Sequence, residues 1–419
     1  MRMVSGQREV PAVAYDVIVV GARVAGAATA MLLARAGLSV LLVDRARLPA
    51  DTLSTHQVQL PGIAALHRWG LLSAITAAGT PATRRLRFDA GPVPLDGEYP
   101  AIDGAGALYS PRRTVLDEVV LDAARQAGAA VRLGFEVGQL TTDDGRVTGI
   151  CGRERRGRAA SELARLVVGA DGKRSVVARC AGAARYRVQP VRTMASYAYW
   201  SGVPTVGGGG EVYRRAGRAV AAFPTNDDLT MIYVGSPAAG FGQARRDLTG
   251  HYLAGLDGCG DLADRVRAGR QAERLRTTPG IAARMHVPYG PGWALAGDAG
   301  LVLDPCSAHG ITRALGDAQL LANAIIGGFG GRGGLAATLP GYHRARDRAA
   351  LPVYRLTASI ARLAPSGAAE RLLYAWLAGR PAEISRFFGV LAGTETLRHF
   401  RTPSAVARIL ADPARRLVA

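Results

Sequence analysis

The sequence predicts an α/β fold in which a parallel-sheet domain is interrupted by a mostly antiparallel β-sheet domain and followed by a helical C-terminal region. Three observations predict it. Apolar runs of buried-strand length end at glycine or aspartate at three distant places, strand-like alternation fills residues 186–284, and a helical apolar period dominates from residue 335. Distant strands with similar ends are typical of a parallel sheet with crossover helices.

The first unit of this fold is a strand, turn, helix and strand between residues 15 and 44. Its turn reads Gly21-Ala-Arg-Val-Ala-Gly26 and its second strand ends at Asp44. Gly21 permits a tight turn, Gly26 lets helix and strand pack closely, and the helix N-terminus offers amides to a pyrophosphate. Asp44 stands where a carboxylate would accept hydrogen bonds from ribose hydroxyls. The unit predicts a Rossmann-like dinucleotide site; the alternative is the same fold without a nucleotide.

Arg23 is a departure from the usual glycine pattern of this turn. It replaces the second glycine, which normally allows the backbone to approach the phosphates closely. Two explanations are open: the loop swings outward, or the Arg23 side chain supplies charge to the ligand region.

The stretch GDAGLVLDPCSAHGIT, from Gly297 to Thr312, follows a short apolar run at Trp293–Ala296. We expect a strand over this run that stops at the Gly297-Asp298 pair, then a loop, and a helix that begins near Ile311 or Thr312. A carboxylate at a strand end can bind a ligand, and the free amides of the helix N-terminus would face the same ligand. The alternative is a strand, turn and helix with no ligand.

A further helix is predicted over Arg112–Gln126. Thr114 has the residue type of an N-cap, and Asp117 three residues later would complete a capping box. Arg113 at the mouth of this helix could reach a phosphate, or it could simply be a solvated charge.

A third strand end with the same pattern occurs at Leu166–Gly169, which leads into Asp171 and Gly172. The three strand ends, near residues 21, 171 and 298, would converge on one crevice if their strands share a parallel sheet.

Taken in this order and spacing, these segments resemble the fingerprints of the FAD-dependent group A flavoprotein monooxygenases, the aromatic hydroxylase superfamily. The segment from Asp51 to His56, with Pro61-Gly62 and Arg68 to Leu71, is similar to the subgroup that includes geranylgeranyl reductases and flavin-dependent halogenases. The resemblance implies that FAD is bound by Gly21, Arg23, Val24, Ala25, Gly26, Asp44, Arg45, Arg113, Val137, Asp171, Gly172, Asp298, Pro305, Gly310, Ile311 and Thr312.

The resemblance also implies a place for each part of the cofactor. The first motif and Asp44 would hold the ADP half, and Arg113 would look toward the phosphates. Asp298 would bind the ribityl or pyrophosphate region, and Pro305 would lie against the isoalloxazine. Amides around Gly310 would face the pyrimidine edge and stabilise negative charge on reduced flavin.

The implied activity is monooxygenation with NAD(P)H and O2. NAD(P)H would reduce the flavin, and a flavin C4a-hydroperoxide would hydroxylate or epoxidise a small organic substrate of aromatic or polyketide-like type. The alternative is reduction of carbon–carbon double bonds, as in geranylgeranyl reductases. Halogenation is not expected, because halogenases of this type carry a WxWxIP motif and an active-site lysine. This chain has Tyr199-Trp200-Ser201-Gly202-Val203-Pro204 at that place, and Lys173 is its one lysine.

Two histidines are candidates for catalytic acid–base work, with a structural role as the alternative for each. His56 lies in the subgroup segment, and His309 adjoins Gly310 in the loop expected to contact the flavin. Cys306 lies in the same loop without an activating partner in the sequence. The four cysteines are far apart and lack CxxC spacing, so neither a metal site nor a disulfide framework is predicted.

Composition limits the other functions. The formal charge of +19 comes almost entirely from arginines scattered along the 419 residues, without a basic helix or RNA-binding motif, so nucleic-acid binding is not expected. No apolar run approaches the length of a membrane helix, and the first dozen residues are expected to form a loose tail. We expect a cytoplasmic monomer or homodimer that binds a small organic molecule.

The predicted domain organisation is discontinuous. Residues 13–75, 105–182 and 285–340 would form the FAD-binding domain, 76–104 and 183–284 the substrate-binding β-sheet domain, and 341–419 the helical C-terminal region. Strands are expected at 195–200, 211–215, 219–223 and 230–234, with a turn at 226–228. Their aromatic residues suit either core packing or a substrate pocket: Tyr197, Tyr199, Tyr213, Phe223 and Tyr233.

Overall fold

The computed structural model describes residues 15–411 except positions 51, 55, 92, 156 and 332. The expected N-terminal tail lies outside the described residues, and so do Asp51 and Thr55 of the subgroup segment.

The first sheet is built on the predicted strand–helix–strand unit. β1 (Tyr15–Val20) pairs in parallel with β2 (Val40–Asp44) on one side and with β10 (Ala159–Gly169) on the other. β10 in turn pairs in parallel with β20 (Trp293–Leu295), and β7 (Ala130–Leu133) lies parallel beside β2. The three predicted strand ends therefore lie side by side at one edge of a parallel sheet, as expected.

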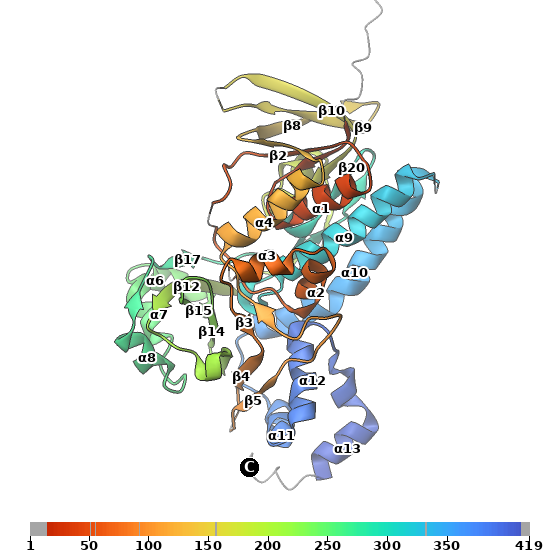
Figure 1. Ribbon diagram of the computed structural model, residues 1–419. Coiled ribbons are helices and arrows are strands. Elements are labelled where there is room, and N and C mark those ends of the chain that lie inside the picture. The colour runs from red at the N-terminus through yellow and green to blue at the C-terminus, as the bar shows by residue number, and fades with distance from the viewer. Residues whose placement is uncertain are drawn as a thin grey trace, which may run out of the picture.

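Antiparallel strands extend this sheet. β9 (Arg146–Arg153) pairs with the first half of β10, β8 (Glu136–Asp143) pairs with β9, and β19 (Tyr289–Gly290) pairs with β20. In Figure 1, β8 and β9 lie at the top of the molecule, away from the second sheet.

Helices α1 (Val24–Arg35), α4 (Arg113–Gln126) and α9 (Gly310–Phe329) form the layer beside the parallel sheet, and α10 (Gly334–Ile360) packs on α9. Within this layer, α1 packs against both α4 and α9 (Figure 1). Alanine fills much of α1, which is buried from Val24 to Met31 and so allows close packing on both sides. The core lies between this layer and the apolar face of the sheet.

The predicted cap of α4 is wrong. The helix begins at Arg113, its N-cap is Arg112, and no side chain caps it. Thr114 lies inside the first turn. Asp117 does not complete a capping box, because its carboxylate is held by Arg113 and Arg23. The ion pairs of Asp117 with two guanidinium groups take the place of the capping hydrogen bond that the sequence pattern suggested.

The second sheet is mostly antiparallel, and it contains the four predicted strands. Its order begins β12 (Thr193–Ser201), β15 (Thr230–Pro237), β14 (Arg218–Pro224) and β13 (Gly210–Arg215). β4 (Arg85–Asp89) and β5 (Leu95–Glu98) then join from an earlier part of the chain, with β4 parallel to β13. The expected turn at 226–228 joins β14 to β15, with Asp227 and Asp228 at positive φ.

The C-terminal region is helical, as predicted. α11 (Ala368–Leu377), α12 (Pro381–Ala392) and α13 (Pro403–Ala411) follow α10, and Pro381 and Pro403 stand at the helix starts. α12 packs on β5, where a Cβ at Gly97 would be only 2.6 Å from Ile384. The C-terminal helices therefore lie beside the β4–β5 end of the second sheet (Figure 1).

The remaining elements are short connections between these layers. They are α2 (Leu60–Arg68), α3 (Leu72–Ala77), β3 (Ala82–Thr83), β6 (Leu108–Tyr109), α5 (Val176–Cys180), β11 (Arg185–Tyr186), α6 (Phe241–Ala244), α7 (Leu248–Ala254), α8 (Leu262–Ala268), β16 (Arg270–Gln271), β17 (Arg276–Thr278), β18 (Arg284–His286) and β21 (Leu301–Val302). In the described part of the chain, no helix is both long and apolar enough to cross a bilayer.

Candidate dinucleotide crevice and adjoining cavity

The turn between β1 and α1 has the close packing that the glycine pattern predicts. Gly21 has φ 104°, and a Cβ there would lie 2.4 Å from the carbonyl oxygen of Ala170. A Cβ at Gly26 would lie 1.7 Å from the carbonyl oxygen of Gly21. Neither position can hold a side chain, so the start of α1 is pressed against the strand ends. Val24 and Ala25 are buried in its first turn.

Arg23 turns its side chain toward α4. Its Nη1 donates to Asp117 Oδ2 at 2.7 Å and to the carbonyl oxygen of Ala50 at 3.1 Å. Arg113 Nη2 donates to Asp117 Oδ1 at 2.7 Å, and the Asp117 side chain is fully buried. Two guanidinium groups thus share one carboxylate and leave one net positive charge beside the N-terminus of α1. This arrangement suits an anionic pyrophosphate, and it supports the second explanation for Arg23.

Asp44 closes the turn from the end of β2. Its Oδ2 accepts the N–H of Ala22 at 2.7 Å, and its Oδ1 accepts the N–H of Ala46 at 2.7 Å. The carboxylate is half-buried and retains lone pairs for a further donor. Arg45 beside it is exposed, whereas Val137 is buried in β8 among the core side chains.

Asp171 follows β10 at the centre of the crevice. Its Oδ2 accepts the N–H of Val176 at 2.6 Å, which ties it to the start of α5, while its buried Oδ1 has no hydrogen-bond partner among the described residues. Burial raises the pKa of Asp171 above its ordinary value, and the bonds to Ser175 and the α5 backbone act against that rise. Gly172 has φ 81° and open space around its Cβ position.

The end of β20 and the start of α9 form the remaining side of the crevice. Gly297 turns the chain at φ 58°, where a Cβ would lie 2.8 Å from Ala25, so this strand end meets the first turn of α1. The Asp298 side chain is exposed into the crevice. Enclosure by the surrounding protein raises its pKa above the ordinary value, while nearby cations, Lys173 first among them, lower it.

α9 begins at Gly310, one residue before the predicted start. Gly310 is exposed, and a Cβ there would have no heavy atom within 4 Å, so there is room at the helix N-terminus. Ile311 and Thr312 are buried, and Thr312 Oγ1 accepts the N–H of Gln59 at 2.9 Å. The first amides of a helix have no partner within it. They therefore remain available to a ligand in the crevice.

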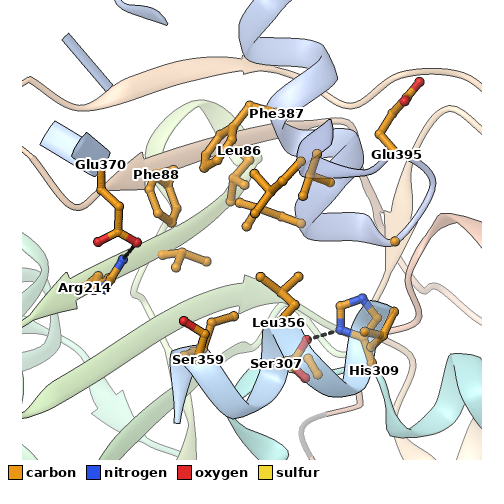
Figure 2. Close-up of a pocket in the computed structure, with 18 of the residues that line it drawn as sticks. Leu86, Phe88, Arg214, Ser307, His309, Leu356, Ser359, Glu370, Phe387 and Glu395 are labelled. Atoms are coloured by element: carbon orange, nitrogen blue, oxygen red, sulfur yellow. Dashed lines mark hydrogen bonds and ion pairs between the residues drawn. The ribbon is translucent and has the colours of Figure 1, made fainter. Parts of the chain in front are cut away.

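A cavity of about 820 Å³ adjoins this helix start. It is bounded by the Pro305–His309 loop, by the second sheet and by α10, α11 and α12. Figure 2 shows Leu86 and Phe88 from β4, Phe387 from α12 and Leu356 from α10 on facing walls. Pro305, Cys306 and Ser307 line the same cavity, so the predicted cofactor loop forms one end of an otherwise largely apolar space.

His309 is buried at this end of the cavity, with 2 % of its surface exposed. Its Nδ1 lies 2.7 Å from the carbonyl oxygen of Ser307 (Figure 2), and its Nε2 has no hydrogen-bond partner among the described residues. Burial lowers the pKa of His309 to about 4, against the opposing effect of the Ser307 carbonyl. The imidazole is therefore neutral near pH 7.

His56 lies away from the cavity wall, within a cluster of aromatic rings. Its ring stacks on Tyr199 at 5.6 Å, its Nε2 is hydrogen-bonded to the Tyr199 hydroxyl, and Tyr197 packs edge-on at 5.9 Å. The Arg112 guanidinium also lies over the Tyr199 ring, 4.0 Å from the ring centroid. Burial lowers the pKa of His56 well below its ordinary value, and Arg113 adds to this. This packing favours the structural alternative for His56.

The sequence did not indicate the role of several residues of the site. Asp117 matched a capping box and instead links two arginines. Gln57, which lines the cavity, follows the subgroup segment without matching a motif. Phe387 and Leu391 reach the cavity from α12, about eighty residues after the loop they face, so only the folded chain brings them there.

The strand ends, the glycine turn and two open helix starts define a protein built to hold a dinucleotide. Residues 14–357 match the family described as FAD binding domain, and the chain belongs to this family. The resemblance to a flavoprotein superfamily that includes geranylgeranyl reductases and flavin-dependent halogenases is confirmed.

Known proteins of differing activity are similar to this chain. A menaquinone reductase of Mycolicibacterium smegmatis is 29% identical over 328 residues, covering 75% of this chain and 76% of the reductase. A digeranylgeranylglycerophospholipid reductase of Methanocella arvoryzae is 26% identical over 316 residues, covering 74% and 77%. The structure of the flavin-dependent brominase Bmp2 superimposes with a TM-score of 0.78 at 18% identity, covering 90% and 93%. The chain is thus an FAD-dependent oxidoreductase by family.

Proposed function

We propose that this chain is an FAD-dependent monooxygenase that uses NAD(P)H and O2 to hydroxylate or epoxidise a small, largely apolar organic substrate of aromatic or polyketide-like type. The observation that carries the proposal is the largely apolar cavity of about 820 Å³, one end of which is the Pro305–His309 loop beside the N-terminus of α9. A substrate in this cavity would lie next to the reactive end of the cofactor and out of bulk water.

The crevice residues fit FAD. The open space at Gly310 and the unpaired buried oxygen of Asp171 leave room and bonding capacity for a ligand. The pyrophosphate would meet the N-terminus of α1 and the charge of Arg23 and Arg113, and Asp44 would accept from the ribose. When bound, FAD supplies the redox chemistry that transfers electrons from NAD(P)H.

The other assigned residues would hold the flavin end. Asp298, exposed into the crevice, would accept hydrogen bonds from the ribityl or pyrophosphate region, and Pro305 would pack on the ring system. The free amides of Ile311 and Thr312 would face the pyrimidine edge, where the helix N-terminus stabilises negative charge. The chain's own contribution to catalysis is then to position substrate and cofactor and to exclude water.

Reduction of a carbon–carbon double bond is the second candidate function. It is favoured by the two curated relatives described above, which are named as reductases of menaquinone and of digeranylgeranylglycerophospholipid. The largely apolar cavity would also accept a long apolar substrate.

The loop end of the cavity offers this second candidate no good proton donor. A reductase must deliver a proton to one carbon of the double bond. Burial raises the pKa of Cys306 well above its ordinary value, and His309, with a pKa of about 4, carries no proton at Nε2 to give. The loop end of the cavity therefore offers poor acids near pH 7.

Halogenation is not proposed despite the similar fold of the brominase. Lys173 lies between β10 and α5, and it is not among the residues that line the cavity. The expected active-site lysine thus has no counterpart in the described cavity wall.

An isotope experiment distinguishes the two candidates. The purified holoenzyme would be incubated with NADPH or NADH under ¹⁸O2 and a panel of hydroxyarenes and geranylgeraniol, and the products analysed by mass spectrometry. Monooxygenation predicts a product heavier by one ¹⁸O atom and no turnover without oxygen. Anaerobic formation of a saturated product would reject monooxygenation in favour of the reductase. A protein without flavin that cannot be reconstituted with FAD would reject both.

A further inference from the structure

The loop end of the cavity contains a hydrogen-bond acceptor whose position and protonation are fixed by the protein. A carbonyl oxygen can only accept, so the 2.7 Å contact to Ser307 requires that His309 Nδ1 carries the proton and donates it. In the neutral ring the other nitrogen, Nε2, is then a bare acceptor. It is buried and has no partner among the described residues.

Gly393 is the residue that covers this acceptor. It ends α12 at φ 80°, and a Cβ there would lie 3.3 Å from His309 Nε2. Both residues line the cavity. A glycine at this position keeps a Cβ away from the acceptor, at the edge of the cavity. Buried polar atoms are almost always paired, so an unpaired one beside a ligand cavity indicates a bond that a ligand completes.

A second polar group lies at the same end. Gln57 lines the cavity and is buried. Its Oε1 accepts a hydrogen bond from Gln59 Nε2 at 2.9 Å, while its Nε2 has no partner among the described residues. Gln59 is itself tied to Thr312 in the first turn of α9. Two unsatisfied polar groups thus lie near the start of α9, whereas Leu86 and Phe387 line the facing wall of the cavity (Figure 2).

We propose that His309 is a positioning residue whose Nε2 accepts a hydrogen bond from a hydroxyl or N–H group of the substrate. This rests on the proposed function, because it assigns the substrate's orientation in the same cavity. The substrate is then an amphipathic molecule: its polar, donor-bearing end lies at the Pro305–His309 loop, and its apolar body extends toward α12. His309 orients the donor without removing its proton, since an imidazole with so low a proton affinity is a weak base.

Ligand binding by the holoenzyme tests this orientation with a matched pair of probes. 1-Naphthol carries the donor, and 1-methoxynaphthalene has the same ring without it. Each would be titrated into flavin-loaded protein and followed through the flavin absorbance. We expect the wild type to bind 1-naphthol about tenfold more tightly, a typical factor for one buried hydrogen bond. We expect this preference to be unchanged between pH 6 and 8.

Three variants identify the atom responsible. His309→Leu removes the acceptor and is expected to bind both probes with equal affinity. His309→Gln can place an amide oxygen near the Nε2 position and is expected to keep part of the preference. Ser359→Ala changes another cavity-lining side chain (Figure 2) and is expected to behave as the wild type. Flavin content is measured for each protein.

The results that would contradict this orientation differ from those that would contradict the proposed oxygen chemistry. A wild type that binds neither probe, or binds both equally, would overturn the orientation, and so would a His309→Leu variant that keeps the full preference. Either result in flavin-loaded protein leaves the proposed oxygen chemistry standing. That chemistry is judged separately by ¹⁸O incorporation.

Discussion

Arg23 Nη1 lies 2.7 Å from Asp117 Oδ2, although 94 residues separate the two in the chain. This ion pair fixes the side chain of Arg23, which stands where the turn lacks its second glycine. The Arg23 side chain lies against α4, and its charge remains beside the N-terminus of α1.

Asp117→Asn is therefore expected to destabilise the protein. The Asp117 side chain is fully buried and pairs with both Arg23 and Arg113, so its loss leaves two guanidinium groups without their counter-charge. Breaking such a pair costs about 3 kcal/mol. Urea unfolding of the flavin-free protein measures the change. Asp122→Asn, at an exposed pair on the same helix, is the control, with an expected change under about 0.5 kcal/mol. Equal stabilities of the two variants would contradict the proposed role of the pair.

Gly26→Ala tests the close approach of α1 to the strand ends. The added Cβ would lie 1.7 Å from the Gly21 carbonyl oxygen, which is backbone and cannot rotate away. We expect a loss of about 3 kcal/mol in the free energy of unfolding. Gly341→Ala is the matched control, because a Cβ there in α10 meets nothing within 4 Å. It should be neutral or stabilising by about 1 kcal/mol. Full stability of Gly26→Ala would show that the turn is looser than described.

Acid stability tests the buried, neutral state of His309. Its pKa is lowered to about 4 in the folded protein, whereas the unfolded chain has the ordinary value of 6.5. Below pH 6.5 the unfolded state therefore binds more protons, and stability falls as the pH decreases toward 4. This one group predicts a loss of about 2 kcal/mol between pH 7 and pH 5. His309→Leu should lose correspondingly less over that interval, although His286 keeps part of the slope. Identical slopes would mean that His309 is not held neutral.

Much of the fold follows from local patterns in the sequence. The β-branched run before Gly21, the apolar run before Asp171 and the alternation from residue 195 are determined by residues close together in the chain. A strand is found at each of these places, although β10 begins at Ala159, before the apolar run that predicted it. That the ends of β20, β10 and β1 meet at one crevice also follows from the rule for parallel sheets, whereas the order of these strands is known only from the structure.

The parts that could not be predicted depend on distant contacts. Asp117 matched a capping box, yet its partner Arg23 comes from another helix. The cavity joins the 305–309 loop to α12, and no local pattern in Phe387 indicates that it would face Leu86. The tautomer of His309 is set by its hydrogen bond to the carbonyl oxygen of Ser307. Such features arise from packing between elements, which spacing and composition do not encode.

The most direct test of the account is an FAD titration of flavin-free wild type, Asp298→Ala and Asp143→Ala, followed by flavin fluorescence. Asp298 is exposed into the crevice, whereas Asp143 is exposed at the far end of β8. The account predicts that Asp298→Ala binds FAD at least about tenfold more weakly, the effect of losing one charged hydrogen bond, while Asp143→Ala matches the wild type. Unchanged FAD affinity in Asp298→Ala would contradict the assignment of this crevice as the flavin site.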